Sequence, residues 1–210
     1  MNRDSDITTI DILRHGECLG GAIFRGHTDS LLSPLGERQM HLALDKLRSH
    51  HNGNENPWQA IISSPLQRCA SIAARLAGEQ LTPTFEPAFQ EISFGDWDGQ
   101  ETDKILKSQP QAVSAFWRDP SRHTPPNGEP LQDFEIRVHR AWQVLLKKQQ
   151  GKNVLLICHG GVVRLLLAKL LSMPLQALPG IHVPYACISR IQIHHQPDSP
   201  DWPQLVFHNA

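Results

Sequence analysis

Short apolar runs alternate with longer amphipathic segments along most of this 210-residue chain. Three runs rich in Ile, Val and Leu predict strands, because such residues fit a pleated and buried surface. They are Ile7–Leu13, Ala60–Ser63 and Val154–Cys158. The last run is apolar at every position, which is typical of a strand that is covered on both faces.

Helical patterns follow these strands. Ser33-Pro34 and Ser64-Pro65 each join a capping residue to a proline that suits the first helical position, which predicts helices at Pro34–Arg48 and Pro65–Gly78. Leu131–Lys148 repeats apolar residues at steps of three and four, as an amphipathic helix does. The other expected elements are helices at Gln100–Lys107, Gln111–Trp117 and Val162–Leu171, strands at Thr82–Pro87, Ala186–Ile193 and Gln204–Phe207, and a proline-rich loop at Asp119–Pro130.

The alternation of strands and helices predicts an α/β fold. Its order favours a three-layer α/β/α sandwich with a mostly parallel central sheet. The chain is long enough for one sizeable hydrophobic core, and no shift in composition divides it. We therefore expect a single domain over residues 1–210.

Composition narrows the possible partners. The chain carries 20 Lys and Arg against 21 Asp and Glu, which argues against a general nucleic-acid or anionic membrane surface. No apolar run reaches the roughly 18 residues of a membrane span, and the polar N-terminus lacks the apolar core of a signal peptide, so we expect a cytoplasmic protein. Cys18, Cys69, Cys158 and Cys187 show no C-x-x-C pairing, which predicts free thiols and no zinc site. None of these features defines an oligomeric state.

Three junctions at strand ends carry imidazole or guanidinium groups. Arg14-His15 follows the first strand, Arg68 lies in the first turn after Ser64-Pro65, and His159-Gly160-Gly161 follows the third strand. Parallel strands end at one edge of a sheet, so these groups are expected to converge there. An imidazole can serve as a nucleophile, guanidinium groups bind anions, and glycines at a helix start bring backbone amides close to a phosphate. The sequence therefore predicts a phosphoryl-transfer site.

Each of these motifs also has a purely structural interpretation. An Arg-His pair at a strand end is often a solvated junction, and a His-Gly-Gly is often only a turn. The glycine-containing stretch Phe94–Gly99 reads equally well as an ordinary loop. Their joint occurrence in this order favours a functional site.

The same blocks resemble the histidine phosphatase superfamily, in its phosphoglycerate mutase-like branch. Leu13-Arg14-His15-Gly16-Glu17 matches the first motif of that family. Further matching blocks are Phe24–Asp29, Leu32–Gly36, Ser63–Arg68, Glu91–Gly99, Gly128-Glu129 and His159–Arg164. The resemblance implies a phosphoglycerate mutase-like fold and a small phosphomonoester as substrate.

The resemblance also implies a role for each matching side chain. His15 would attack phosphorus and become phosphohistidine, and Glu91 would protonate the leaving group and then activate water. The residues implied to hold the phosphoryl group or the substrate are Arg14, Arg25, Gly26, Arg68, His159 and Gly160. Arg14, Arg68 and His159 would also counter charge in the transition state, so no metal and no cofactor is expected.

Features between the motifs favour hydrolysis over mutase activity. The stretch from Glu91 to Gly128 holds only four basic residues, fewer than a bisphosphate site implies. The compact length and the segment that begins at Gly128 resemble alpha-ribazole phosphatases, which implies alpha-ribazole 5′-phosphate as substrate and a place in cobalamin assembly. Broad-specificity sugar phosphatases share these motifs and remain an alternative, as does phosphoglycerate mutase. A non-catalytic phosphate-binding module and a histidine-based metallohydrolase are the alternatives from other classes.

The chain departs from the family pattern at one phosphate contact. Family members often carry asparagine a few residues after the first motif, where this chain reads Leu19-Gly20-Gly21-Ala22. That contact is therefore absent here, or is supplied by the backbone or by His27. The chain also reads Gly-Glu-Pro at residues 128–130, where many members read Gly-Glu-Ser.

Overall fold

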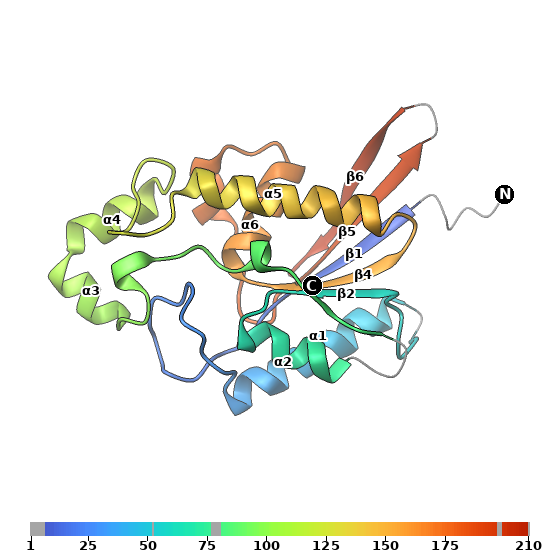
Figure 1. Cartoon of the computed structure of the whole chain (residues 1–210), viewed down its shortest axis with the longest axis horizontal. Coiled ribbons are helices and arrows are strands. Elements are labelled where there is room, and N and C mark those ends of the chain that lie inside the picture. Colours follow the sequence, from blue (N-terminus) through green and yellow to red (C-terminus); the bar gives the residue numbers. More distant parts are fainter. Residues whose placement is uncertain (1–6, 52, 77–80, 197–198, 210) are drawn as a thin grey trace.

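The computed structural model describes residues 7–51, 53–76, 81–196 and 199–209. Within these residues six strands form one mixed sheet in the order β3-β2-β4-β1-β5-β6 (Figure 1). Strands β1 (Ile7–Arg14), β2 (Ala60–Ser63), β3 (Thr84–Phe85) and β4 (Asn153–Cys158) are parallel. The last two strands, β5 (Ile188–Gln196) and β6 (Ser199–His208), run antiparallel to their neighbours.

Helices cover both faces of this sheet, which confirms the predicted three-layer α/β/α arrangement. Helices α1 (Pro34–Ser49) and α2 (Gln67–Leu76) lie on one face, and α5 (Leu131–Lys148) and α6 (Gly160–Leu170) lie on the other (Figure 1). Successive residues of β4 point to opposite faces, so Leu155 packs with α1 and α2 while Leu156 packs with α5 and α6. This is why every position of β4 after Asn153 is apolar.

A small third cluster lies beyond the carboxyl edge of the parallel strands. It contains α3 (Thr102–Ser108), α4 (Pro110–Arg118) and the short 3₁₀ helix η3 (Gly95–Trp97), shown in green in Figure 1. Buried apolar side chains hold it together, namely Phe24, Trp97, Ile105, Val113 and Phe116. Two more 3₁₀ helices, η2 (Pro87–Phe89) and η4 (Leu175–Gly180), complete the fold.

Several helices and strands begin or end at residues other than those predicted from the sequence. Helix α2 begins at Gln67 and not at Pro65, because the Ser64 hydroxyl accepts from the amide of Leu66 in a turn that precedes the helix. Its predicted end at Gly78 lies outside the described residues. The predicted strand at Thr82–Pro87 is only the two-residue β3, since Pro87 starts a 3₁₀ helix.

The final strand is longer than the predicted Gln204–Phe207. It spans Ser199–His208 and is antiparallel to β5. The stretch between β5 and β6 is too short for the crossover that parallel strands need. Among the described residues no helix has the length and apolar character needed to cross a membrane.

Candidate active site

Backbone hydrogen bonds bring the three predicted junctions together. Arg14 stands opposite Cys158 in the β1–β4 register. The amide of His15 donates to the carbonyl of Cys158 at 3.0 Å, and the amide of Ser64 donates to the carbonyl of Ile157 at 3.0 Å. The chain segments that follow β1, β2 and β4 therefore start side by side, as expected for parallel strands.

His15 is held as a neutral imidazole with one free nitrogen. Its side chain is buried, and Nδ1 lies 2.8 Å from the carbonyl oxygen of Gly16. A carbonyl oxygen can only accept, so Nδ1 carries the proton and Nε2 keeps its lone pair. Burial, followed by the charges of Arg68 and Arg14, holds the pKa of His15 well below its usual value of 6.5.

His159 lies behind His15, with the two ring centroids 5.2 Å apart. The Arg68 guanidinium donates through Nε to Nδ1 of His159 at 3.3 Å. Burial, followed by the charge of Arg68, holds the pKa of His159 well below 6.5. The single ring proton therefore sits on Nε2, which donates to the Ser64 hydroxyl at 2.7 Å.

Arg68 is fully buried and binds the chain that carries Arg25 and Gly26. Its Nη1 donates to the carbonyl of Thr28 at 2.8 Å, and its Nη2 donates to the carbonyl of Gly26 at 2.7 Å. Gly26 in turn packs tightly, since a Cβ there would lie 2.3 Å from the carbonyl oxygen of Ile92. Arg68 thus holds both the loop around Gly26 and the ring of His159.

Glu91 is anchored at the start of α6. One carboxylate oxygen accepts from the amide of Gly161 at 3.0 Å, and the other accepts from the amide of Ile92 at 3.0 Å. A Cβ at Gly161 would lie 2.2 Å from Oε1 of Glu91, so a glycine is needed there. The two amides fix the orientation of the Glu91 carboxyl group at the start of α6.

The backbone carbonyl of Glu91 is fixed by two side chains from other segments, Arg137 and His27. Arg137 on α5 donates through Nη2 to the carbonyl of Glu91 at 2.9 Å. Both carboxylate oxygens of Glu129 accept hydrogen bonds from the same guanidinium, at 2.6 and 2.8 Å. His27 also donates to the Glu91 carbonyl, at 3.0 Å. Glu129 belongs to a matching block, but nothing in the sequence pattern of α5 marks Arg137 as its partner.

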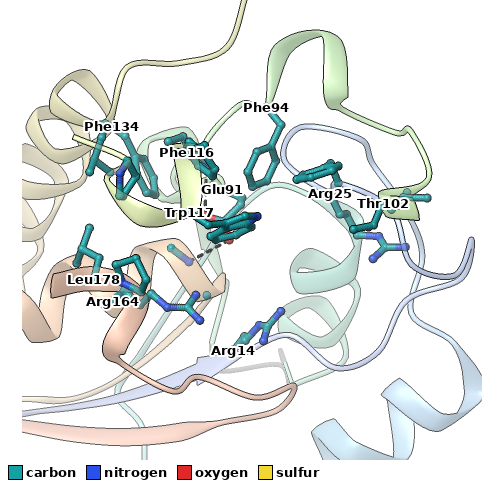
Figure 2. A pocket seen from close by; sticks show the side chains of 18 of the residues that line it. Arg14, Arg25, Glu91, Phe94, Thr102, Phe116, Trp117, Phe134, Arg164 and Leu178 are labelled. Atoms are coloured by element: carbon teal, nitrogen blue, oxygen red, sulfur yellow. Dashed lines mark hydrogen bonds between the residues drawn. The ribbon is translucent and has the colours of Figure 1, made fainter. Parts of the chain in front are cut away.

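A cavity of about 310 Å³ opens in front of His15. Of the predicted site residues, Arg14, His15, Arg25, Glu91 and Gly160 line it, whereas Gly26, Arg68 and His159 do not. Most of the remaining wall is aromatic or aliphatic: Ile23, Phe24, Ile92, Phe94, Phe116, Trp117, Pro120, Leu131, Phe134, Leu178, Pro179 and Tyr185. Figure 2 shows Arg14 and Arg164 on either side of the space next to Glu91, with Phe94, Phe116 and Trp117 above it.

Arg164 is a wall residue that the sequence analysis placed in a motif without giving it a role. Its Nε donates to the carbonyl of Ile181 at 3.0 Å. A Cβ built on Gly160 would meet Nη1 of Arg164 at 3.0 Å and Nε of Arg14 at 3.4 Å. The missing side chain of Gly160 therefore leaves room for two guanidinium groups at the start of α6. Burial lowers the pKa of Arg164, and the Arg14 charge adds to this while Glu91 opposes it.

The segment that lacks the family asparagine binds Arg25 through its backbone. Nη2 of Arg25 donates to the carbonyls of Leu19 and Gly21, at 3.0 and 2.9 Å, and Nε donates to the Ser30 hydroxyl at 3.2 Å. Asp98 closes the same loop by accepting from the amides of Gly26, His27 and Thr28. Across the described ranges no three or more His, Cys, Asp or Glu side chains are placed to hold a metal ion.

Comparison with known proteins places this chain in a family. A family model described as the histidine phosphatase superfamily (branch 1) matches residues 10–201. The chain therefore belongs to the histidine phosphatase superfamily.

Individual relatives carry more than one name. An adenosylcobalamin/alpha-ribazole phosphatase of Escherichia coli is 29% identical over 188 residues, covering 88% of this chain and 90% of the relative. A Yersinia pestis protein named "Probable phosphoglycerate mutase GpmB" is 29% identical over 191 residues, covering 89% and 85%. The crystal structure of a mycobacterial glucosyl-3-phosphoglycerate phosphatase matches with a TM-score of 0.80 at 27% identity, covering 97% of this chain and 99% of that one. The family is thus shown, while the names of these relatives differ in substrate.

Proposed function

We propose that this protein is a phosphomonoesterase that works through a phosphohistidine at His15. The observation that carries this proposal is the state of the His15 ring. Its Nδ1 is committed to the Gly16 carbonyl, its low pKa keeps the ring neutral, and Nε2 retains a lone pair beside a cavity. A nucleophile for phosphorus needs this combination of an available lone pair and a fixed orientation.

The reaction proceeds in two displacements. Nε2 of His15 forms a bond to phosphorus while the P–O bond to the leaving alkoxide breaks, and Glu91 donates the proton that the alkoxide takes up. Glu91 then accepts a proton from water, whose oxygen attacks phosphorus as the P–N bond breaks and inorganic phosphate is released. Arg14 lies where it can hold the phosphoryl oxygens. Arg68 and His159 lie behind His15, where Arg68 donates to His159 and the two imidazole rings are in contact.

The leaving group that best suits the cavity is an alcohol that carries a flat apolar ring, and we propose alpha-ribazole 5′-phosphate. Aromatic and aliphatic side chains form most of the wall, and the benzimidazole of alpha-ribazole offers the flat apolar surface that such a wall binds. A sugar phosphate without such a ring would leave much of the aromatic wall without an apolar partner. The names of the Escherichia coli and Salmonella typhimurium relatives agree with this substrate. A cytoplasmic place in cobalamin assembly belongs to the same proposal.

The covalent step is tested by rapid mixing with a ³²P-labelled phosphomonoester and an alkaline quench, under which phosphohistidine survives. Wild-type protein is expected to retain label. His15→Ala is expected to retain none, and the exposed His41→Ala serves as the matched control that still labels. Equal labelling of His15→Ala and wild type would overturn the assignment of the nucleophile. Unchanged turnover in a metal chelator is expected, since no step uses a metal, and loss of activity would instead support a metallohydrolase.

The substrate is tested by comparing kcat/KM across a panel. The panel contains alpha-ribazole 5′-phosphate, 3-phosphoglycerate, glucose 6-phosphate and fructose 1,6-bisphosphate. We expect alpha-ribazole 5′-phosphate to be hydrolysed with the highest kcat/KM. A preference for the sugar phosphates, or formation of 2-phosphoglycerate from 3-phosphoglycerate, would replace this substrate with a sugar phosphatase or mutase reaction.

A further inference from the structure

Tyr185 packs directly on Arg14 and His15, two residues of the candidate active site. Its ring centroid lies 5.7 Å from that of His15, and Cζ of Arg14 stands 4.5 Å from the centre of the same ring. The side chain is 38% exposed, so one face of the ring touches buried groups and part of it faces solvent. No motif block includes Tyr185, and its contacts arise only from the fold.

The backbone next to Tyr185 is bonded to the same two residues. The amide of Ala186 donates to the carbonyl of His15 at 3.1 Å, and the amide of Arg14 donates to the carbonyl of Cys187 at 3.0 Å. Ala186 has a φ of 53°, in the left-handed region that non-glycine residues seldom occupy. Such a conformation persists where the surroundings over-determine it. The turn around Ala186 therefore sets the position of the Tyr185 ring against β1.

Arg14 has a buried donor that nothing in the described structure satisfies. Its Nη1 donates to the carbonyl of Val183, while its Nε is buried without a hydrogen-bond partner. The absent side chain of Gly160 leaves space beside that Nε, since a Cβ there would lie 3.4 Å away. A buried donor without a partner costs free energy, so the position of the guanidinium depends on its contacts with the Val183 carbonyl and the Tyr185 ring.

We propose that Tyr185 is a positioning residue for phosphoryl transfer, acting through Arg14. This inference rests on the proposed phosphatase function. The ring and the Val183 carbonyl together hold the guanidinium in the wall of the cavity in front of His15. A cation over an aromatic face is attracted most strongly where water is excluded. The electron-rich face, and not the hydroxyl, supplies this contact.

Tyr185 also stands between two hollows. It lines the cavity in front of His15 and a second hollow of about 510 Å³, whose other wall is formed by residues 17–22 and Ser33. A small replacement would join the two hollows and change solvent access together with the Arg14 contact. A leucine fills most of the space and removes only the aromatic face, so it is the informative substitution.

The test compares Tyr185→Phe with Tyr185→Leu in the full chain. Two quantities are measured, namely the inhibition constant of inorganic phosphate and the single-turnover rate of phosphoenzyme formation from p-nitrophenyl phosphate. Tyr185→Phe is expected to stay within about twofold of wild type, because the aromatic face is kept. Tyr185→Leu is expected to weaken phosphate binding and slow phosphoenzyme formation by about tenfold each, at an unchanged melting temperature.

A double-mutant cycle with Arg14→Gln tests whether Tyr185 affects phosphate binding through Arg14. If Tyr185 acts through Arg14, Tyr185→Leu changes phosphate binding little in the Arg14→Gln background. An equal loss in both backgrounds, or equal behaviour of the Phe and Leu variants, would refute the proposal. Tyr185→His provides a second ring-bearing variant should the leucine variant fold poorly. Absence of phosphoenzyme in wild type would reject the proposed function instead, and the phosphate inhibition constants would still report on Tyr185.

Discussion

The tautomer and the pKa of the His15 ring depend on groups that lie next to it in space. Its Nδ1 proton is fixed by the neighbouring Gly16 carbonyl, which the chain supplies locally. Its low pKa comes from burial and from three arginines, Arg68, Arg14 and Arg25, of which only Arg14 is a neighbour in sequence. Arg68 reaches the same place through α2. A single imidazole therefore combines a locally set tautomer with a charge state that the fold sets.

Replacing Arg14 by glutamine should raise the pKa of His15. The Arg14 charge is one of the causes that lower this pKa, and its removal makes protonation of the ring easier. NMR titration of ¹³Cε1-labelled histidine measures the shift directly. In wild type the His15 signal should remain that of the neutral ring as the pH falls through 6.5. A His15 midpoint at or above 6.5 in wild type would contradict this account.

The first turns of α1 and α6 show how helix starts shape the site. Ser33 caps α1 by accepting from the amide of Gly36 at 3.0 Å, as its sequence predicts. Gly36 also packs against the chain after β1, because a Cβ there would lie 1.9 Å from the carbonyl oxygen of Glu17. At α6 the amide of Gly161 binds Glu91. In both helices a glycine in the first turn allows close contact with another segment.

Substituting Gly161 by alanine should impair acid catalysis more than folding. The new Cβ would come within 2.2 Å of Oε1 of Glu91, and the carboxylate must swing away because it is the mobile end of a side chain. Phosphoenzyme formation from an alkyl phosphate should slow by about a hundredfold, the usual effect of a misplaced general acid. Quench-flow measurements give this rate.

The same substitution should affect p-nitrophenyl phosphate less, since its leaving group needs no proton. Gly180→Ala is the matched control, because a Cβ at Gly180 meets nothing within 4 Å. Its rates and stability should equal those of wild type. Equal slowing of both substrates by Gly161→Ala would argue against a proton-donor role for Glu91.

A buried charge network ties the sheet to the segment after α1. Asp11 on β1 accepts two bonds from Arg190 on β5, at 2.7 and 3.1 Å, and one from the indole of Trp58 at 2.8 Å. His51 lies 2.7 Å from the same carboxylate. Burial would raise the pKa of Asp11, but the bonds from His51 and Arg190 and the Arg190 charge outweigh it and lower the pKa.

Asp11→Asn should destabilise the whole molecule strongly. It leaves the buried Arg190 charge without its partner, a change that costs about 3–5 kcal/mol in the free energy of unfolding. Urea unfolding measures the loss. Asp45→Asn is the control, because Asp45 pairs with Arg48 at a site where its side chain is 68% exposed, and such pairs contribute about 0–1 kcal/mol. A similar small effect for both substitutions would show that the network contributes little to stability.

Stability should also fall as the pH drops below 6.5. The pKa values of His15, His139 and His159 are all lowered in the folded state, each with burial as the largest cause. Below pH 6.5 the unfolded chain therefore binds more protons than the folded chain. The stability that the three neutral histidines contribute is complete above pH 6.5 and is lost as the pH falls toward their folded pKa values. Urea midpoints at pH 7.5 and 5.5 test this. His159→Gln should show a smaller difference between the two, and an equal or larger difference would contradict the assignment.

Local chemistry in the chain determined the positions of the main elements and the residues at their ends. The extent of α5 and the Ser33 cap of α1 follow from periodicity and capping, which act within one or two turns. The placement of Arg14, His15 and His159 at strand ends follows from the same kind of signal. All of these features follow from residues that are close to one another in the sequence.

The orientation of the groups around the cavity depended on the packing of distant segments. Sheet register and loop closure turned Arg68 inward onto backbone carbonyls and left Arg164 in the cavity wall. They also brought Phe24, Phe116 and Tyr185 to the wall of one cavity from three separate parts of the chain. Such contacts depend on which strands pair and on how far each loop reaches. The periodicity of a single segment indicates neither the pairing nor the reach.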